Sequence, residues 1–159
     1  MVVSNTSPII GLAAVGQLDL LCALYGQILI PPAVRDEVEE GANRPGGTSL
    51  ATRPWIETRH VQNRLSVSTL QLELGAGESE AIALAAETRS DVLLMDEHKG
   101  RTIAARLGLK VVGSLGILIL AKHRGVLPAV RPVMDALVHE SGFRVSQSVF
   151  ERALRLAGE

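Results

Sequence analysis

The chain has 159 residues, of which 47% are hydrophobic and only 3% aromatic, and its formal net charge is -1. This length suits one domain with a full core, which we expect to span residues 1–159. The charge excludes the broad basic footprint of a dedicated duplex-DNA binder, and the aromatic content argues against a stacking platform for single strands. Cys22 is the only cysteine, which excludes an intrachain disulfide and a cysteine-rich zinc site. Without a signal peptide or an apolar run of about 18 residues, the sequence predicts a soluble cytoplasmic protein with no membrane partner.

In the first half of the chain, apolar runs alternate with stretches whose apolar residues recur at helical spacing. Apolar runs predict strands at residues 1–4 and 27–30, and a weak alternation predicts a third strand at residues 55–60, at an edge of the sheet. The helical spacing predicts helices at residues 9–15, 17–25, 33–40 and 66–72, and Pro8 would open the first of them. Residues 41–54 are rich in Gly, Pro, Ser and Thr, so they predict a mobile loop in which residues 48–52 could form one helical turn.

The second half of the chain continues this alternation and ends in helices. It predicts helices at residues 78–88 and 100–107, strands at residues 91–95 and 110–113, and final helices at residues 115–121, 127–140 and 146–157. A strand, a helix and a second strand in this order imply a parallel sheet. The whole order predicts an α/β fold, a three-layer α/β/α sandwich with a parallel sheet of about five strands.

Two carboxylates should meet at one edge of this sheet. At ~1.5 Å per residue the helix from Glu80 to Arg89 rises about 14 Å, and at ~3.3 Å per residue the strand from Asp91 to Asp96 returns about 17 Å. Because the two lengths nearly cancel, Glu80 and Asp96 are expected at the carboxyl edge of the strands, where open α/β sheets bind ligands. Each also has a structural interpretation, Glu80 as a surface residue favoured by the helix dipole and Asp96 as an N-cap. Their expected convergence favours a functional role.

Other motifs are weak or missing. Gly75 and Gly77 precede a helix but do not clearly follow a strand, and the third glycine of a dinucleotide-binding loop is missing. The sequence has no P-loop, no His/Cys cluster with zinc-ligand spacing and no nucleophile elbow. Glu37 could face the same cleft as the other carboxylates, or it could belong to a solvated acidic face of helix 33–40. Clustered carboxylates select Mg²⁺ or Mn²⁺, which activate water for attack on a phosphate.

Four segments, in their order and spacing, make the sequence similar to a known family. They are VVSNTSPII, ILIPPAVRDEV, GAGESEAIALA and DVLLMDEHKGRTIAARLGLKVVGSLGILILAK. Over nearly its whole length the chain resembles the PIN domain superfamily, and more closely its VapC-like branch. The resemblance implies a PIN-like fold and a Mg²⁺- or Mn²⁺-dependent, single-strand-specific RNA endonuclease. It also implies the toxin of a toxin–antitoxin pair, with a small antitoxin protein as partner and a homodimer as the oligomer.

The resemblance also assigns roles to individual residues. By position, the metal ligands fall on Asn5, Glu37, Glu80 and Asp96, and the catalytic carboxylates are the last three of these. Three polar residues are expected next to the metal ligands without binding the ion themselves: Thr6, Ser7 and Glu97.

Lys99 and Arg101 come shortly after Asp96, which makes them candidates for contacts with RNA phosphates. An ordinary solvated charge on a helix is an equally good interpretation of both.

Two positions depart from the family pattern. Asn5 replaces the expected Asp, which removes a negative charge from the metal site, and Leu94 stands where many members have Thr. An amide oxygen can still coordinate a metal but cannot act as a base, so Asn5 favours a second hypothesis, a catalytically impaired PIN-like module that binds RNA or protein. A third hypothesis, a receiver-like signalling domain, needs an acidic pair after the first strand, which Asn5 and Thr6 do not supply.

Overall fold

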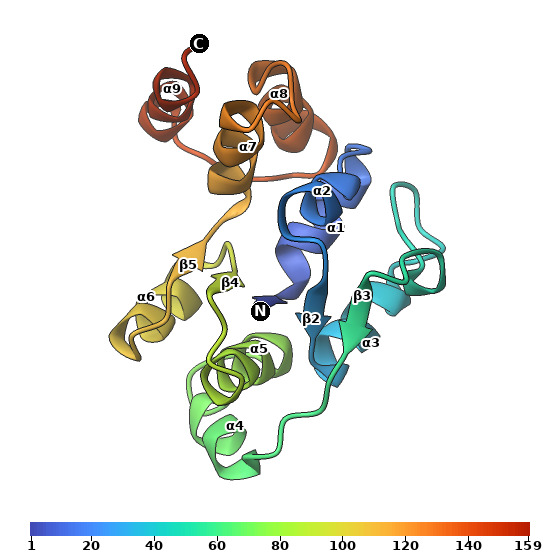
Figure 1. The fold of residues 1–159 in the computed structure, drawn as a ribbon, viewed down its shortest axis with the longest axis vertical. Helices are drawn as coiled ribbons and strands as arrows, with labels where there is room; N and C mark the ends of the chain where they lie inside the picture. Colours follow the sequence, from blue (N-terminus) through green and yellow to red (C-terminus); the bar gives the residue numbers. More distant parts are fainter.

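A computed structural model describes residues 1–159 and contains one parallel sheet (Figure 1). Its five strands are β1 (Val2–Ser4), β2 (Ile28–Ile30), β3 (Ile56–Thr58), β4 (Val92–Leu94) and β5 (Val111–Val112). The strand order is β3-β2-β1-β4-β5, and every neighbouring pair is parallel. Val3 on β1 lies opposite Leu29 of β2 and Leu93 of β4. The predicted α/β class and the predicted five strands are confirmed.

Helices cover both faces of this sheet. They are α1 (Thr6–Ala14), α2 (Asp19–Tyr25), α3 (Pro32–Glu40), α4 (Arg64–Leu70), α5 (Ala76–Glu87), α6 (His98–Arg106), α7 (Ser114–His123), α8 (Arg131–Glu140) and α9 (Gln147–Leu156). Figure 1 shows α1, α2, α7, α8 and α9 on one side of the strands and α4, α5 and α6 on the other, and α3 contacts both α1 and α5. The arrangement is the predicted three-layer sandwich.

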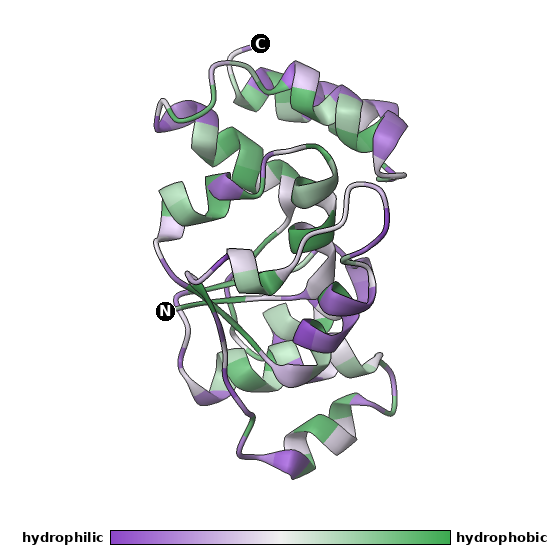
Figure 2. Ribbon diagram, turned by 90° about the vertical axis from the view of Figure 1, so that its right-hand side faces the viewer, coloured by the Kyte–Doolittle hydropathy of each residue, from purple (hydrophilic) through white to green (hydrophobic).

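The three central strands form the core because they are apolar except for Ser4 at the end of β1. Val3, Ile28, Leu93 and Leu94 are completely buried, as a strand covered on both faces requires. Figure 2 shows the strands largely in green, the hydrophobic colour, between helices that carry both green and purple segments. The edge strand β5 is only partly buried.

The chain adds β2 and β3 on one side of β1, and then β4 and β5 on the other side. At such a switch point, between β1 and β4, open α/β sheets form a crevice at the carboxyl ends of their strands. The ladder continues one residue past β1, because the Asn5 amide donates to the Leu94 carbonyl over 2.9 Å. Asn5 and Asp96 therefore leave adjacent strands at this crevice. No helix is long and apolar enough to cross a membrane.

The two largest differences between predicted and observed helix starts both involve proline. The first helix begins at Thr6 rather than near Pro8, since Pro8 occupies the third helical position, where its missing N–H has no intrahelical partner to lose. The helix predicted over residues 127–140 begins only at Arg131. Pro128 lacks the N–H that a helix interior needs, whereas Pro132 is accommodated in the first turn. The predicted loop at residues 41–54 contains a short 3₁₀ helix at Leu50–Thr52, close to the predicted turn.

Candidate functional site

The residues after β1 supply an amide and two hydroxyls to the crevice. Asn5 is 2% exposed and extended, and its Nδ2 donates to Glu97 Oε2 over 3.0 Å. The Oδ1 of the same amide is buried without any hydrogen-bond partner. The Thr6 hydroxyl donates to Glu37, and the Ser7 hydroxyl donates to Glu97. Burying an acceptor without a hydrogen bond costs free energy, so a ligand bound to Asn5 Oδ1 would stabilise the structure.

Glu37 enters the crevice from α3 and closely approaches the start of α5. A Cβ atom at Gly77 would lie 2.7 Å from both Oε1 and Oε2 of Glu37. Only glycine allows this approach, because real Cβ atoms do not come so close to a neighbouring atom. The glycine therefore gives the Glu37 carboxylate its place beside the first turn of α5.

Glu78, in that first turn, is surrounded by other carboxylates. Its partial burial raises the pKa of its carboxyl group above the ordinary range, and the negative charges of Glu97 and Glu37 raise it further. The Lys99 ammonium acts in the opposite direction. Like charges that raise one another's pKa favour a bound cation, which would stabilise the ionised forms together.

Asp96 follows β4 and is held by the start of α7. Its Oδ1 accepts the Ser114 amide over 2.6 Å, and its Oδ2 accepts the Ser114 hydroxyl over 2.7 Å. Burial nevertheless raises the pKa of the Asp96 carboxyl; the Ser114 bonds and the Arg101 charge lower it, and the charge of Glu97 raises it. Ser114 thus orients Asp96, and Glu97 links it electrostatically to Glu78.

Glu80 is also close to the carboxyl edge, but its bonds are different. Its Oε2 accepts the Ala33 amide over 2.9 Å, and its Oε1 pairs with Arg64 over 3.0 Å. Ala33 lies in the first turn of α3, where backbone N–H groups lack intrahelical partners. Glu80 thereby ties α3 and α4 to α5, and it is Glu78 that faces the carboxylates of Glu37 and Glu97.

The structure therefore links five of the residues at one crevice, Asn5, Thr6, Glu37, Asp96 and Glu97. Sequence reasoning missed Glu78 and Ser114 as members of this group. A signal for Glu78 was present, because it directly follows the glycine that lets Glu37 approach. Ser114 gave no such signal, since its contact with Asp96 depends on how β5 and α7 are joined.

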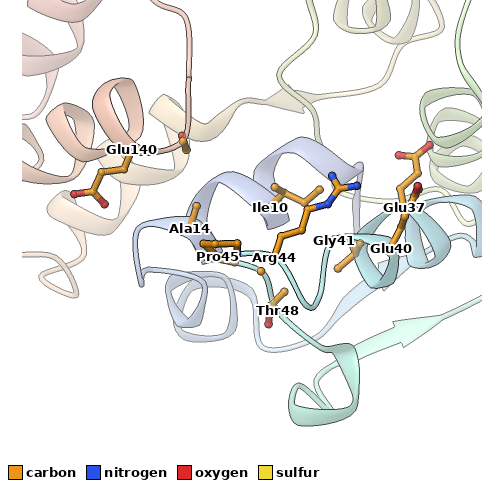
Figure 3. Close-up of a pocket in the computed structure, with 14 residues that line it drawn as sticks. Ile10, Ala14, Glu37, Glu40, Gly41, Arg44, Pro45, Thr48 and Glu140 are labelled. Carbon is orange, nitrogen blue, oxygen red and sulfur yellow. The ribbon is translucent and has the colours of Figure 1, made fainter.

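Three cavities adjoin this crevice. One of about 310 Å³ lies between α1, α3 and the loop after α3, with Glu37 and Arg44 in its wall (Figure 3). A second of about 520 Å³ contains Thr6, Ser7 and Glu97. A third of about 660 Å³ is lined by His98 and Arg101, and both the second and the third contain Asp96. Of the two predicted phosphate contacts, Arg101 lines a cavity beside Asp96, and Lys99 is exposed on α6.

The chemistry of these side chains fits a hard divalent cation, although no three carboxylate, imidazole or thiolate groups converge on a single point as they stand. The available donors are oxygens, the type that Mg²⁺ and Mn²⁺ prefer. Glu37 accepts the Thr6 hydroxyl through Oε2 alone, which leaves its Oε1 available to an ion, whereas Glu97 accepts through both oxygens, from Asn5 and Ser7. Asn5 Oδ1 has no partner and is also available.

Comparison with known proteins agrees with this geometry. The model of the DUF3368 family, described as a PIN domain, matches residues 1–159. No curated protein and no solved structure matches the chain. The match extends over the whole sheet and every residue of the acidic crevice, and it points to a nuclease or RNA-binding function. The chain belongs to this family of PIN domains.

Proposed function

We propose that the protein is a Mg²⁺- or Mn²⁺-dependent endonuclease that cuts single-stranded RNA. The observation that carries this proposal is the unpaired, buried Asn5 Oδ1 at an acidic crevice. Burial and the charges of Glu97 and Glu37 raise the pKa of Glu78 there, and burial and the charge of Glu97 raise the pKa of Asp96. An acidic cluster with a free oxygen acceptor is a site that favours a cation, and an RNA phosphate needs one in order to approach so many carboxylates.

The ligands that we propose are Asn5, Glu37, Glu78 and Asp96. Bound Mg²⁺ or Mn²⁺ would polarise a phosphodiester and lower the pKa of a water molecule. Ser114 holds Asp96 in one orientation through two hydrogen bonds. Thr6 and Ser7 hold Glu37 and Glu97, and Glu80 fixes the start of α3, the helix that carries Glu37. Glu80 is thus proposed as a positioning residue in place of the ligand role that the resemblance implies.

The test compares two neighbouring carboxylates on α5. We expect Glu78→Gln to reduce Mn²⁺-dependent cleavage of a fluorescent single-stranded RNA by at least about 100-fold, as loss of a ligand should. Glu80→Gln keeps an oxygen to accept the Ala33 amide, so it should reduce cleavage by less than about tenfold. Asp96→Asn serves as a second ligand variant, and circular dichroism confirms that each variant is folded.

The opposite result, with Glu80→Gln inactive and Glu78→Gln active, would return the ligand role to Glu80. Full activity in Asp96→Asn would overturn the metal site altogether. Cleavage that persists in EDTA would show that the chemistry does not need the metal.

A second function is favoured by the same Asn5. With an amide in place of the first acid, the chain could bind RNA or a protein without cutting it. Tight RNA binding by the native chain, with no cleavage at any Mn²⁺ concentration, would support this alternative.

The toxin role, the small antitoxin partner and the homodimer rest on the VapC-like resemblance, and we retain them as proposals. Expression of the native chain in a bacterial host should arrest growth, and Asp96→Asn should relieve the arrest. Growth unaffected by an active ribonuclease would contradict the toxin role.

A further inference from the structure

The three cavities at the crevice share lining residues and so lie next to one another, and we call the three together the groove. The first and second cavities share Ile10 and Ser141. The second and third share Asp96, Phe143 and Arg144. The groove thus begins beside the loop after α3, passes the acidic residues and continues between α6 and the segment that joins α8 to α9. Its middle is the site of the proposed cleavage.

This joining segment, residues 141–146, forms one wall of the groove and is fixed at both ends. Gly142 adopts a φ of 71°, which turns the chain away from α8. The Phe143 amide then donates to the Leu137 carbonyl over 3.0 Å, and the Ser146 hydroxyl caps α9 by accepting the Val149 amide over 3.3 Å. Phe143 is therefore held at the boundary between the second and third cavities by backbone bonds.

Positive charges lie toward both ends of the groove. Arg44 lies in the wall of the first cavity, where Figure 3 shows its guanidinium reaching toward the space between Ile10 and Glu37. Arg101 and Arg144 line the third cavity. Arg44 and Arg144 are exposed and form no ion pair or side-chain hydrogen bond in the structure, so both are available to a ligand.

We propose that the groove holds a single RNA strand along its length, with Arg144 bound to a phosphate and Phe143 stacked against a base next to the cleavage point. This inference rests on the proposed function and extends it to the substrate path. Arg44 would contact a phosphate on the other side of the carboxylates.

The chemistry of each group supports this assignment. The Phe143 ring is partly buried against the core yet borders two cavities beside Asp96. A rigid aromatic ring with apolar packing beneath it can stack any base without selecting its sequence. Arginine binds phosphate through its planar fork of N–H groups. One ring is far from the multi-base platform that the low aromatic content excludes, so we expect a short contact with the strand.

The experiment separates the groove from the acidic centre by using two substrates. Bis(p-nitrophenyl) phosphate needs only the centre, whereas a single-stranded RNA 12-mer also fills the groove. We expect Arg144→Glu and Phe143→Leu each to lower kcat/KM for the RNA about tenfold or more and to leave hydrolysis of the small substrate unchanged. Phe143→Tyr keeps the ring and should retain RNA cleavage, while Leu keeps only the apolar packing. Arg152→Glu, an exposed arginine on α9 that lines none of the three cavities, is the charge-matched control.

Binding of the labelled 12-mer with Ca²⁺ in place of Mn²⁺, followed by fluorescence anisotropy, gives a separate binding readout while a hard divalent cation still supplies positive charge at the carboxylates. Arg144→Glu should weaken binding, and its slope of log affinity against log salt should be smaller by about 0.7, the share of one single-strand phosphate. If the native chain cuts neither substrate but binding falls in these variants, the proposed function fails and the groove stands. If RNA cleavage and binding in Phe143→Leu and Arg144→Glu equal those of the native chain and Arg152→Glu, the groove assignment is wrong.

Discussion

At the scale of single residues, the environment of Asn5 determines how its substitution would act. The Asn5 Nδ2 donates to Glu97, and the Oδ1 of the same amide has no partner. One side chain thus supplies a donor to Glu97 and a free acceptor for a ligand. An aspartate at the same position would offer only acceptors and would face Glu97 with a like charge. Asparagine at position 5 is therefore compatible with the metal-free crevice, whereas an acid there would repel Glu97.

We expect Asn5→Asp to lower the melting temperature of the metal-free protein by several degrees. A hydrogen bond to a charged group contributes about 1.5–3 kcal/mol, and ~1 kcal/mol corresponds to roughly 2–4 °C for a chain of this size. Mn²⁺ affinity should rise roughly tenfold, because the added carboxylate attracts a divalent ion strongly in a cleft of low effective dielectric. RNA cleavage should rise with it.

Isothermal titration with Mn²⁺ and thermal melts with and without the ion measure these effects. Asn63→Asp, at an exposed N-cap of α4 far along the chain, is the matched control and should change neither quantity appreciably. Equal Mn²⁺ affinity in the native and Asn5→Asp chains would mean that position 5 is not a ligand.

At the scale of elements, the glycine at the start of α5 links the helix to the site. Gly77 lies in the first turn, and its missing side chain leaves room for the Glu37 carboxylate from α3. We expect Gly77→Ala to leave the melting temperature unchanged or slightly raised, since alanine favours helix and the atom it meets is the end of a flexible side chain. The same change should weaken Mn²⁺ binding about tenfold by displacing Glu37 from the site.

Gly75→Ala is the control for this prediction, because a Cβ there would meet Glu78 Oε1 only at an ordinary 3.7 Å. Metal titration of both variants and of the native chain makes the comparison. Native Mn²⁺ affinity in Gly77→Ala would show that the position of Glu37 does not matter for the ion.

The strands and helices also show how much of the fold could be predicted from the sequence. Short apolar runs identified four strands, and a weak alternation identified the edge strand β3, since both patterns depend on local sequence alone. The helix and strand lengths also placed Glu80 at the correct edge. They could not show that Glu78, two residues earlier, is the residue that faces Glu37 and Glu97, because that depends on the rotation of α5 about its own axis. Contacts with Ala33 and Arg64 set this rotation, and they come from distant segments.

At the scale of the whole molecule, four carboxyl groups divide into two sets with opposite effects on stability. Glu78 and Asp96, at the crevice, have a raised pKa, mainly because of burial. Asp91 and Glu159 have a lowered pKa. Asp91 accepts from the Met1 amino group, and Glu159 accepts the Val130 amide over 2.6 Å and pairs with Lys122 over 3.0 Å. One set thus lies at the proposed site and the other ties down the two ends of the chain.

These shifts predict the pH dependence of the metal-free protein. A carboxyl whose pKa is raised by folding binds more protons in the native state, so its contribution to stability falls as pH rises from its ordinary value of about 4 through the raised value. A carboxyl whose pKa is lowered stabilises the native state above about pH 4 and loses that effect as pH falls through the lowered value. Metal-free stability should therefore be greatest in mildly acidic solution, lower at neutral pH and lower again in strong acid.

Mn²⁺ should reverse the fall in stability between mildly acidic and neutral pH. The ion binds ionised carboxylates, so its stabilising effect grows as Glu78 and Asp96 lose their protons, and it offsets their repulsion at neutral pH. Thermal melts between pH 3 and pH 8, in EDTA and in excess Mn²⁺, measure both curves. In the double variant Glu78→Gln and Asp96→Asn, the fall of metal-free stability toward neutral pH and the response to Mn²⁺ should both shrink, while the loss in strong acid remains because Asp91 and Glu159 are untouched. A metal-free melting temperature that rises steadily from pH 5 to pH 7 in the native chain would contradict the assignment, since the crevice carboxylates would then gain from ionisation without an ion to hold them together.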